Sequence, residues 1–271
     1  MNRDTVADPA FEFGENWARF LGTLSEQRIE HATRCVSVLV GCDLRDKAFI
    51  DIGSGSGLSS LAARRLGARV YSFDYDPRSV ACTEALRKRF FPGDDCWTVA
   101  QGSVLDETYL SGLGQFDVVY SWGVLHHTGS MWRAIENAGR LVREGGLFVI
   151  GIYNHRGGRR GTDTWKKLKR WYCQAPRWQR AAWEAAYITW ELASITMVGR
   201  SPIRKIREVD RGMSWRRDIT DWLGGFPYEA ATPGEILEFA RKKLDFVLVK
   251  QNIHCGLGVS EFVFESPKRS Q

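Results

Sequence analysis

A turn with three alternating glycines is the first feature of this chain that could form a ligand site. Gly53, Gly55 and Gly57 follow Asp51 in the stretch DIGSGSG. Because glycine has no Cβ, the backbone of such a turn can approach a bound molecule closely. The stretch lacks the third glycine of G-x-G-x-x-G, which disfavours a dinucleotide, and the Gly-Lys-Ser/Thr of a P-loop. A tight strand-to-helix turn uses glycines in the same way, so the pattern needs support from other residues.

An acidic residue at the end of a second apolar run gives that support. Asp74 closes the run ARVYSFD, 17 residues beyond Gly57. In open α/β sheets ligands bind at the carboxyl ends of the strands, where a carboxylate can accept hydrogen bonds from both hydroxyls of a ribose. Capping of the next helix is the alternative role, although Asp76 is placed to do this. The two motifs together predict a site for a molecule that contains ribose.

Two adjacent histidines and a later polar cluster could move protons. His126 and His127 lie in SWGVLHH, after the fourth expected strand, and Tyr153, Asn154 and His155 follow the fifth. Imidazole, with an ordinary pKa of about 6.5, can accept a proton near neutral pH. The structural alternative is that a histidine at the start of a turn hydrogen-bonds the backbone. We take His126, His127 and Tyr153 as the candidate catalytic residues.

The elements that position these residues alternate between strands and helices. Short apolar runs predict strands, and a 3.6-residue period predicts helices between them. The expected strands are residues 47–52, 68–74, 96–101, 116–122, 146–153, 245–251 and 260–264. The expected helices are residues 25–40, 131–142 and 233–243, with two more that begin at residues 58 and 77. This alternation predicts an α/β fold with a doubly wound parallel sheet and helices on both faces.

Residues 156–217 differ from the rest of the chain in charge and in aromatic content. They contain 16 Lys and Arg against 5 Asp and Glu, whereas the whole chain has a net charge of only +6, and they hold six of the eleven tryptophans. Such a contrast predicts an insertion or cap. Its helical stripes are Trp165, Leu168 and Tyr172, then Trp183, Tyr187 and Trp190, which either pack the insertion onto the body or face a substrate.

We expect four segments in the chain. They are an N-terminal helical or cap segment (1–44), a ligand-binding core (45–155), a basic, Trp-rich helical insertion (156–230), and the last helix and two strands of the core (231–271). Residues 11–20 and the insertion are the natural sources of a lid, and residues 221–229 are expected to form a loop that closes one side.

The motifs together resemble those of the class I S-adenosylmethionine-dependent methyltransferases. The resemblance covers about residues 45–155 and the closing strands, and it rests on DIGSGSG, FDYDP, QGSVLD, FDVVYSWGVLHH and LVREGGLF. It implies a Rossmann-like, seven-stranded sheet with the last strand antiparallel. The implied cofactor is S-adenosylmethionine, lying across the ends of the first four strands.

The resemblance also implies roles for single residues. Asp51 would attract the ammonium group of the cofactor, the three glycines would line its methionine and ribose, and Asp74 would hold the ribose hydroxyls. The other matching positions are Tyr75, Ser103 and Val104 at the adenine, and Ser121 and Trp122 at the methionine and sulfonium. Many relatives have an aspartate where this chain has Ser103, so Asp106 is an alternative partner for the adenine amine.

The sequence after the fourth strand indicates which kind of molecule accepts the methyl group. Nucleic-acid and protein amide N-methyltransferases of this class usually have an Asn-Pro-Pro-Tyr-like sequence there, and this chain has Ser-Trp-Gly-Val. The metal-dependent catechol enzymes need clustered Asp and Asn ligands, which this sequence lacks, so we expect no catalytic metal. We expect methylation of a small molecule at oxygen. A phosphorylated or carboxylated, hence anionic, acceptor would suit the basic insertion.

Three other functions stay open at this point. C-methylation of a phosphorylated or alkene-bearing metabolite would give the aromatic residues a cation to stabilise. The basic, aromatic insertion also suits RNA, but no known RNA-binding module accompanies it, so a nucleic-acid partner is disfavoured. A non-catalytic scaffold with the same fold would not need the glycines and Asp74.

The expected location is the cytoplasm. The first residues lack a signal-peptide pattern, and the sequence shows no apolar run long enough to span a membrane. The six cysteines are scattered without a CxxC pair, which indicates reduced thiols. A homo-oligomer is compatible with the sequence.

Overall fold

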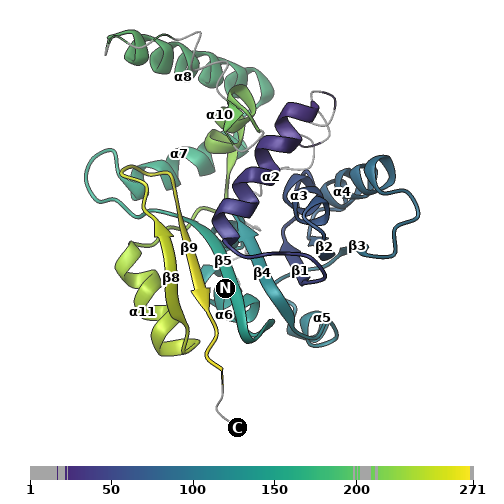
Figure 1. Cartoon of the computed structure of the whole chain (residues 1–271). Coiled ribbons are helices and arrows are strands. Elements are labelled where there is room, and N and C mark those ends of the chain that lie inside the picture. Colours follow the sequence, from purple (N-terminus) through teal and green to yellow (C-terminus); the bar gives the residue numbers. More distant parts are fainter. Residues whose placement is uncertain are drawn as a thin grey trace, which may run out of the picture.

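The computed structural model describes residues 24–197 and 213–268, together with residues 17, 22, 199, 201, 209 and 210. Its centre is a seven-stranded sheet with the order β3-β2-β1-β4-β5-β9-β8 (Figure 1). The strands are β1 (Ala48–Ile52), β2 (Arg69–Asp74), β3 (Trp97–Gln101), β4 (Phe116–Trp122), β5 (Val142–Tyr153), β8 (Val247–Asn252) and β9 (Val259–Glu265). Strands β1 to β5 are parallel, and β9 runs antiparallel to β5 and β8. The predicted sheet is confirmed, with β9 as the antiparallel last strand.

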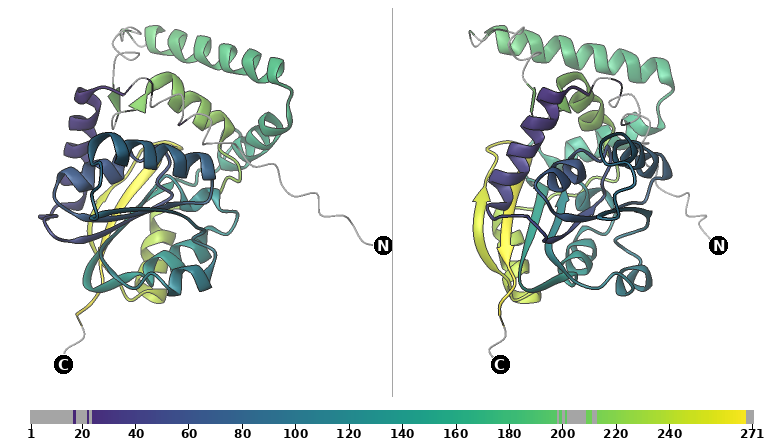
Figure 2. Two further views of the ribbon diagram at one scale, coloured as in Figure 1. Left: turned by 90° about the vertical axis from the view of Figure 1, so that its right-hand side faces the viewer. Right: turned by 45° about the vertical axis from the view of Figure 1, so that its right-hand side comes forward.

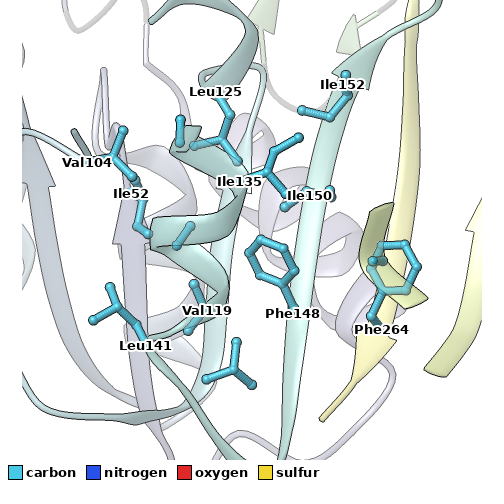
Figure 3. Close-up of a cluster of buried hydrophobic side chains, with 14 of the residues drawn as sticks. Ile52, Val104, Val119, Leu125, Ile135, Leu141, Phe148, Ile150, Ile152 and Phe264 are labelled. Carbon is cyan, nitrogen blue, oxygen red and sulfur yellow. The ribbon is translucent and has the colours of Figure 1, made fainter. Parts of the chain in front are cut away.

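Helices cover both faces of the sheet. On one face α2 (Glu26–Val40), α3 (Leu58–Arg65) and α4 (Pro77–Phe90) share a core with the side chains of that face. On the other face α5 (Glu107–Ser111), α6 (Met131–Gly139) and α11 (Pro233–Lys243) close a second core. Figure 3 shows part of the second core, where Phe148 and Ile150 of β5 point toward Ile135 of α6. The helices alternate with buried strands as the sequence predicts.

Local signals in the sequence set several helix ends. Asp76 caps α4 by accepting a hydrogen bond from the N–H of Arg78, and Pro77 stands in its first turn. In α11, Thr232 and Glu235 form a capping box. Such caps satisfy N–H groups that the helix itself leaves unpaired.

The described part of the insertion after β5 contains three helices. They are α7 (Thr162–Gln174), α8 (Arg177–Met197) and α10 (Trp215–Gly224), and a short ribbon of β6 (Val209–Asp210) and β7 (Met213–Ser214) precedes α10. Tyr172 of α7 packs with Ile219 and Leu223 of α10. Helix α8 contains no buried residue and lies outermost (Figure 2). Trp165 and Tyr172 therefore help to pack the insertion, whereas Trp190 of the second stripe is 57% exposed.

The structure differs from the sequence prediction in a few boundaries. Strand β5 begins at Val142 instead of residue 146, and α6 ends at Gly139 instead of residue 142. The prediction that residues 221–229 form a loop is wrong for residues 221–224, which end α10. The N–H of Gly225 donates to the carbonyl of Asp221, which closes this last helical turn. None of the helices within the described ranges is long and apolar enough to cross a membrane.

Candidate functional site

The carboxyl edge of the sheet joins the glycine turn to Asp74. The N–H groups of Gly53 and Ser54 donate to the carbonyl of Phe73, at 2.8 and 3.1 Å. The N–H of Gly55 donates to Oδ2 of Asp74, and the N–H of Asp76 donates to Oδ1, both at 2.9 Å. Each carboxylate oxygen has a second lone pair, so Asp74 can still accept a hydrogen bond at each oxygen. Asp74 thus holds the glycine turn in place and can also accept hydrogen bonds from two hydroxyls of a ligand.

Two of the three glycines are required for different reasons. Gly53 has φ +75°, and an added Cβ would lie 2.3 Å from Cγ1 of Val124. Gly57 has φ +80°, and its added Cβ would lie 2.8 Å from the Cα of Thr83 in α4. Side chains are disfavoured at both positions by backbone strain and by close contact. Gly57 therefore serves helix packing, whereas Gly53 lets the turn touch the segment that follows β4.

The two carboxyls at this edge favour a cationic ligand. Asp51 at the end of β1 is 3% exposed and accepts a hydrogen bond of 2.5 Å from Oγ of Ser60. Burial, together with the nearby charge of Asp74, raises the pKa of Asp51 to about 7. Burial also raises the pKa of Asp74 to about 6, although the N–H groups of Asp76 and Gly55 oppose this. Desolvated carboxylates gain from a positive charge and repel a pyrophosphate, which supports the earlier argument against a dinucleotide.

The residues expected at the adenine differ in their surroundings. The side chain of Tyr75 is 78% exposed, next to Asp74. Val104 points into the core beside Ile52 (Figure 3), and its carbonyl accepts a hydrogen bond from Nδ2 of Asn137. The hydroxyl of Ser103 accepts a hydrogen bond from the backbone of its own loop. Asp106, the alternative partner of the amine, caps α5. At these positions Tyr75 and the backbone at residues 103 and 104 remain the better candidates for an adenine contact.

Ser121 and Trp122 already have partners within the protein. The hydroxyl of Ser121 is fully buried and donates to the carbonyl of Ile52 at 3.0 Å. The indole N–H of Trp122 donates to Oε1 of Glu261 at 2.8 Å. Ser121 thus ties β4 to β1 and Trp122 ties it to β9, and a contact with the methionine would come from their backbone.

Within the N-terminal segment 11–20, the structure describes Trp17, and the other residues lie outside the described ranges. An added Cβ on Gly55 would lie 3.0 Å from Nε1 of Trp17. The indole of Trp17 therefore lies beside the glycine turn, at the place where the expected lid would cover the cofactor.

The histidine pair begins two residues beyond Val124. His126 and His127 end the short 3-10 helix η1 (Leu125–His127), and their rings have centroids 4.4 Å apart. The ring of Tyr153, at the end of β5, lies 4.1 Å from that of His126 and 5.6 Å from that of His127. The structure thus brings together the three predicted catalytic residues.

The hydrogen bonds of the two histidines distinguish their roles. Nδ1 of His126 accepts the N–H of Tyr153 at 3.4 Å, so the proton of neutral His126 is on Nε2. That N–H is buried without a hydrogen-bond partner in the described part of the chain. Nδ1 of His127 lies 2.6 Å from the carbonyl of Pro227, which can only accept, so Nδ1 of His127 carries a proton and Nε2 has the lone pair. At Nε2, His126 is therefore a hydrogen-bond donor and His127 a hydrogen-bond acceptor.

Lys169 completes this cluster and was missed by the sequence analysis. Its side chain is 0% exposed, and its ammonium group donates to the carbonyl of Trp222. Nζ lies 4.1 Å from the ring centroid of Trp222, 4.8 Å from that of Tyr228 and 5.7 Å from that of Tyr153. The signal in the sequence was the helical period, because Lys169 falls on the apolar stripe of Trp165.

Burial sets the protonation of the cluster. It lowers the pKa of Lys169 to about 7 and that of His127 to about 3, and it holds the pKa of His126 well below its usual range. The positive charge of Lys169 lowers the pKa of both histidines further. Both imidazoles are therefore neutral near pH 7.

The remaining residues of the polar cluster after β5 lie outside this group. Asn154 is buried and its amide donates to the carbonyls of His254 and Gly256, which ties down the loop between β8 and β9. His155 is exposed. Within the described ranges, no three His, Cys, Asp or Glu residues gather closely enough to hold a metal ion.

Comparisons with known proteins decide the class of the core. Residues 50–150 match the family described as a methyltransferase domain. The match extends from β1 to β5. The predicted enzyme class and its methyl donor, S-adenosylmethionine, are confirmed for this domain.

One curated relative and two solved structures show how far the methyltransferase likeness extends. The chain is 34% identical over 118 residues to a ribosomal protein L11 methyltransferase of Bacillus cytotoxicus, covering 43% of this chain and 35% of that protein. Thus the chain spans about a third of the length of this relative.

Two solved structures share the fold over most of the chain. One is a putative methyltransferase of Haloferax volcanii in complex with the Trm112 methyltransferase activator, with a TM-score of 0.55, 14% identity and coverage of 96% of this chain and 98% of that one. The other is the magnesium protoporphyrin IX methyltransferase of Synechocystis with bound S-adenosylhomocysteine, with a TM-score of 0.54, 13% identity and coverage of 94% and 93%.

The methyltransferase domain contains only part of the candidate site. The glycine turn, Asp74 and both histidines lie within residues 50–150. Tyr153 lies just beyond, and Lys169 and Trp222 belong to the insertion. The cofactor half of the site thus lies in the part of the chain that matches the methyltransferase domain, and the half around Lys169 is contributed by the insertion.

Proposed function

We propose that this protein transfers the methyl group of S-adenosylmethionine to a hydroxyl oxygen of a small molecule, with His127 as the general base. The observation that carries the proposal is the tautomer of His127. Its proton is held on Nδ1 by the carbonyl of Pro227, so the lone pair on Nε2 can accept a proton. The ring lies in a turn that begins next to Val124, the residue packed on Gly53.

The carboxyl edge fits the cofactor in shape and in charge. Asp74 would accept the ribose hydroxyls, and the backbone at Gly53 and Gly55 leaves space that a Cβ would fill. Asp51 and Asp74 have raised pKa values, which favours a ligand with an ammonium and a sulfonium group. S-adenosylmethionine supplies a methyl group that is already activated as a sulfonium. The protein then has to bind, orient and deprotonate the acceptor.

His127 suits this task even though burial lowers its pKa to about 3. A hydroxyl oxygen that attacks the methyl carbon before losing its proton would become an oxonium, whose proton is far more acidic than an imidazolium. A neutral imidazole of low basicity can accept that proton as the new bond forms. The Cε1 edge of the ring faces Gly225, where an added Cβ would lie 2.7 Å from Cε1. A side chain at position 225 would therefore displace the ring.

Exclusion of water and alignment of the acceptor are the other contributions. Lys169 of α7 and Trp222 of α10 meet Tyr153 at the end of β5, so the insertion covers the histidine cluster. Holding two reactants in line can lower a barrier by roughly 7 to 11 kcal/mol in favourable cases. Helices α7 and α10 are therefore the proposed lid over the acceptor, and the segment boundary at residue 156 separates lid from core.

A protein acceptor is the second candidate. The relative from Bacillus cytotoxicus is named for methylation of ribosomal protein L11, and α8 exposes Trp178 and Trp190, at 70% and 57%, on the outer side of the insertion. C-methylation is less well supported, because the rings of Trp222, Tyr228 and Tyr153 already surround the cation of Lys169.

Transfer of a labelled methyl group tests the proposal. The protein is incubated with methyl-labelled S-adenosylmethionine and with small-molecule, protein and RNA fractions of a cell extract, and products are identified by mass spectrometry. We expect the label in a small molecule, as a methyl ether or ester. Label in protein or RNA, or on carbon, would contradict the proposed acceptor.

A variant pair tests the proposed base. His127→Gln should lower kcat by about two to four orders of magnitude, with unchanged affinity for S-adenosylhomocysteine. The exposed His155→Gln is the matched control and should keep full activity.

A cytoplasmic location and the oligomeric state stay predictions.

A further inference from the structure

A buried cation without an ion-pair partner lies at the centre of the insertion half of the site. The carboxyl group of Asp221 and the thiol of Cys173 are near enough to oppose the fall in its pKa. Lys169 is 0% exposed, and within the described residues its ammonium group forms no ion pair. Its hydrogen-bond partner is the neutral carbonyl of Trp222. Aromatic faces stabilise an ammonium group only in part, and a desolvated charge gains much more from an anion.

A second buried donor lies next to it. The N–H at Nε2 of His126 is fully buried and has no acceptor in the described part of the chain. Both groups lie around the ring of Tyr153, with Nζ of Lys169 5.7 Å and the ring of His126 4.1 Å from its centroid. The charge of Lys169 also lowers the pKa of His126, which is a sign of their proximity. A buried donor without an acceptor is rare in folded proteins, and one beside a buried cation that forms no ion pair indicates a place for an acceptor atom of a ligand.

Space for a ligand group begins beside Lys169. A cavity of about 20 Å³, room for about one water molecule, is lined by Trp165, Leu168, Lys169, Tyr172, Trp183 and Leu223. Its walls belong to α7, α8 and α10. Apart from Lys169, the side chains that line it are apolar or aromatic. A larger group would enter when these insertion helices move apart, as expected for a lid.

We propose that Lys169 and His126 bind a carboxylate of the acceptor, so that the substrate is a hydroxy acid with a flat, unsaturated body. This inference rests on the proposed function and names the substrate class of the same site. The carboxylate would receive one hydrogen bond from Nζ and one from Nε2 of His126. Aromatic rings around Lys169 would contact the body of the acid, and His127 would remain beside the hydroxyl.

Benzoate and its neutral analogue benzamide are suitable probes. The protein is first saturated with S-adenosylhomocysteine, and each probe is then titrated by calorimetry below pH 7, where Lys169 is protonated. We expect benzoate to bind at least about tenfold more tightly than benzamide, as for a charge-assisted hydrogen bond. Lys169→Met should abolish this preference, whereas Lys167→Met, at an exposed lysine of the same helix, should keep it.

Two further readouts separate a binding role from a structural one. Lys169→Met removes an unpaired buried charge, so the free variant should melt at a temperature equal to or above that of the wild type. Loss of the benzoate preference in a well-folded variant is then an effect on binding. His126→Leu should weaken the binding of benzoate several-fold and that of benzamide less, because a hydrogen bond to a carboxylate is stronger than one to a neutral carbonyl. Unchanged benzoate affinity would remove His126 from the site.

The outcomes distinguish this inference from the proposed function. Failure of the wild type to bind S-adenosylhomocysteine would overturn the proposed function. Binding of S-adenosylhomocysteine without a preference for benzoate, including no binding of either probe, would overturn the carboxylate site alone. A preference that survives Lys169→Met would overturn it as well.

Discussion

Replacement of Asp74 by alanine is the most informative test of the cofactor half of the site. The carboxylate accepts the N–H groups of Gly55 and Asp76 at 2.9 Å, and it has one lone pair on each oxygen left for the ribose hydroxyls. A hydrogen bond to a charged group contributes about 1.5 to 3 kcal/mol. Because about 1.4 kcal/mol corresponds to a factor of ten, Asp74→Ala should lower the affinity for S-adenosylhomocysteine by one to two orders of magnitude.

The pH dependence of binding gives an independent check on the same residue. The pKa of Asp74 in the free protein is raised to about 6 by burial. The ligand hydroxyls need the ionised carboxylate, so affinity should show one step in which it falls as the pH drops through about 6. Asp51, with a pKa raised to about 7, contributes a second step at higher pH. Asp74→Ala should remove the step of Asp74 and keep that of Asp51, which should move to lower pH because the charge of Asp74 no longer raises the pKa of Asp51.

The assay is calorimetry with S-adenosylhomocysteine between pH 5 and pH 8, with Asp76→Ala as the matched control. Asp76 caps α4, so its loss should cost about 1 kcal/mol of stability with little effect on affinity. Melting curves of both variants exclude unfolding as the cause of a weaker affinity. Equal affinity of Asp74→Ala and wild type, or the same pH profile in both, would refute the assignment of Asp74 to the ribose.

Three further outcomes are expected from the same structure. Gly53→Ala should abolish cofactor binding, because its Cβ would lie 2.3 Å from Val124, whereas Gly123→Ala has the same φ of +75° with nothing within 4 Å and should bind normally; calorimetry on both checks this. Deletion of residues 160–210 should abolish turnover but leave S-adenosylhomocysteine affinity within about tenfold, and residues 159–170 should become protected from protease when cofactor product and acceptor are bound. Retained turnover or equal proteolysis would assign the insertion to packing. Activity should persist in EDTA, and its loss there with recovery in Mg²⁺ would show that a metal takes part.

The sequence by itself determined those features that depend on neighbouring residues. Alternating apolar runs and helical periods specify the order of strands and helices, because each segment must bury its own apolar side. Asp76 followed by Pro77 specifies the start of α4 through a local hydrogen bond. The glycine turn and Asp74 are recognisable for the same reason, since they occupy the ends of successive strands that must meet at one edge of a parallel sheet.

The tertiary structure alone decided what the buried polar groups do. The two histidines are adjacent and chemically identical in the sequence, yet the N–H of Tyr153 makes one of them a donor, and the carbonyl of Pro227, 100 residues away, makes the other an acceptor. Lys169 stands among other basic residues, and it becomes a buried cation only because Trp222 folds back over α7. The physical reason is that protonation and charge depend on desolvation and on partners in space, and long-range contacts are specified only when the whole chain has folded.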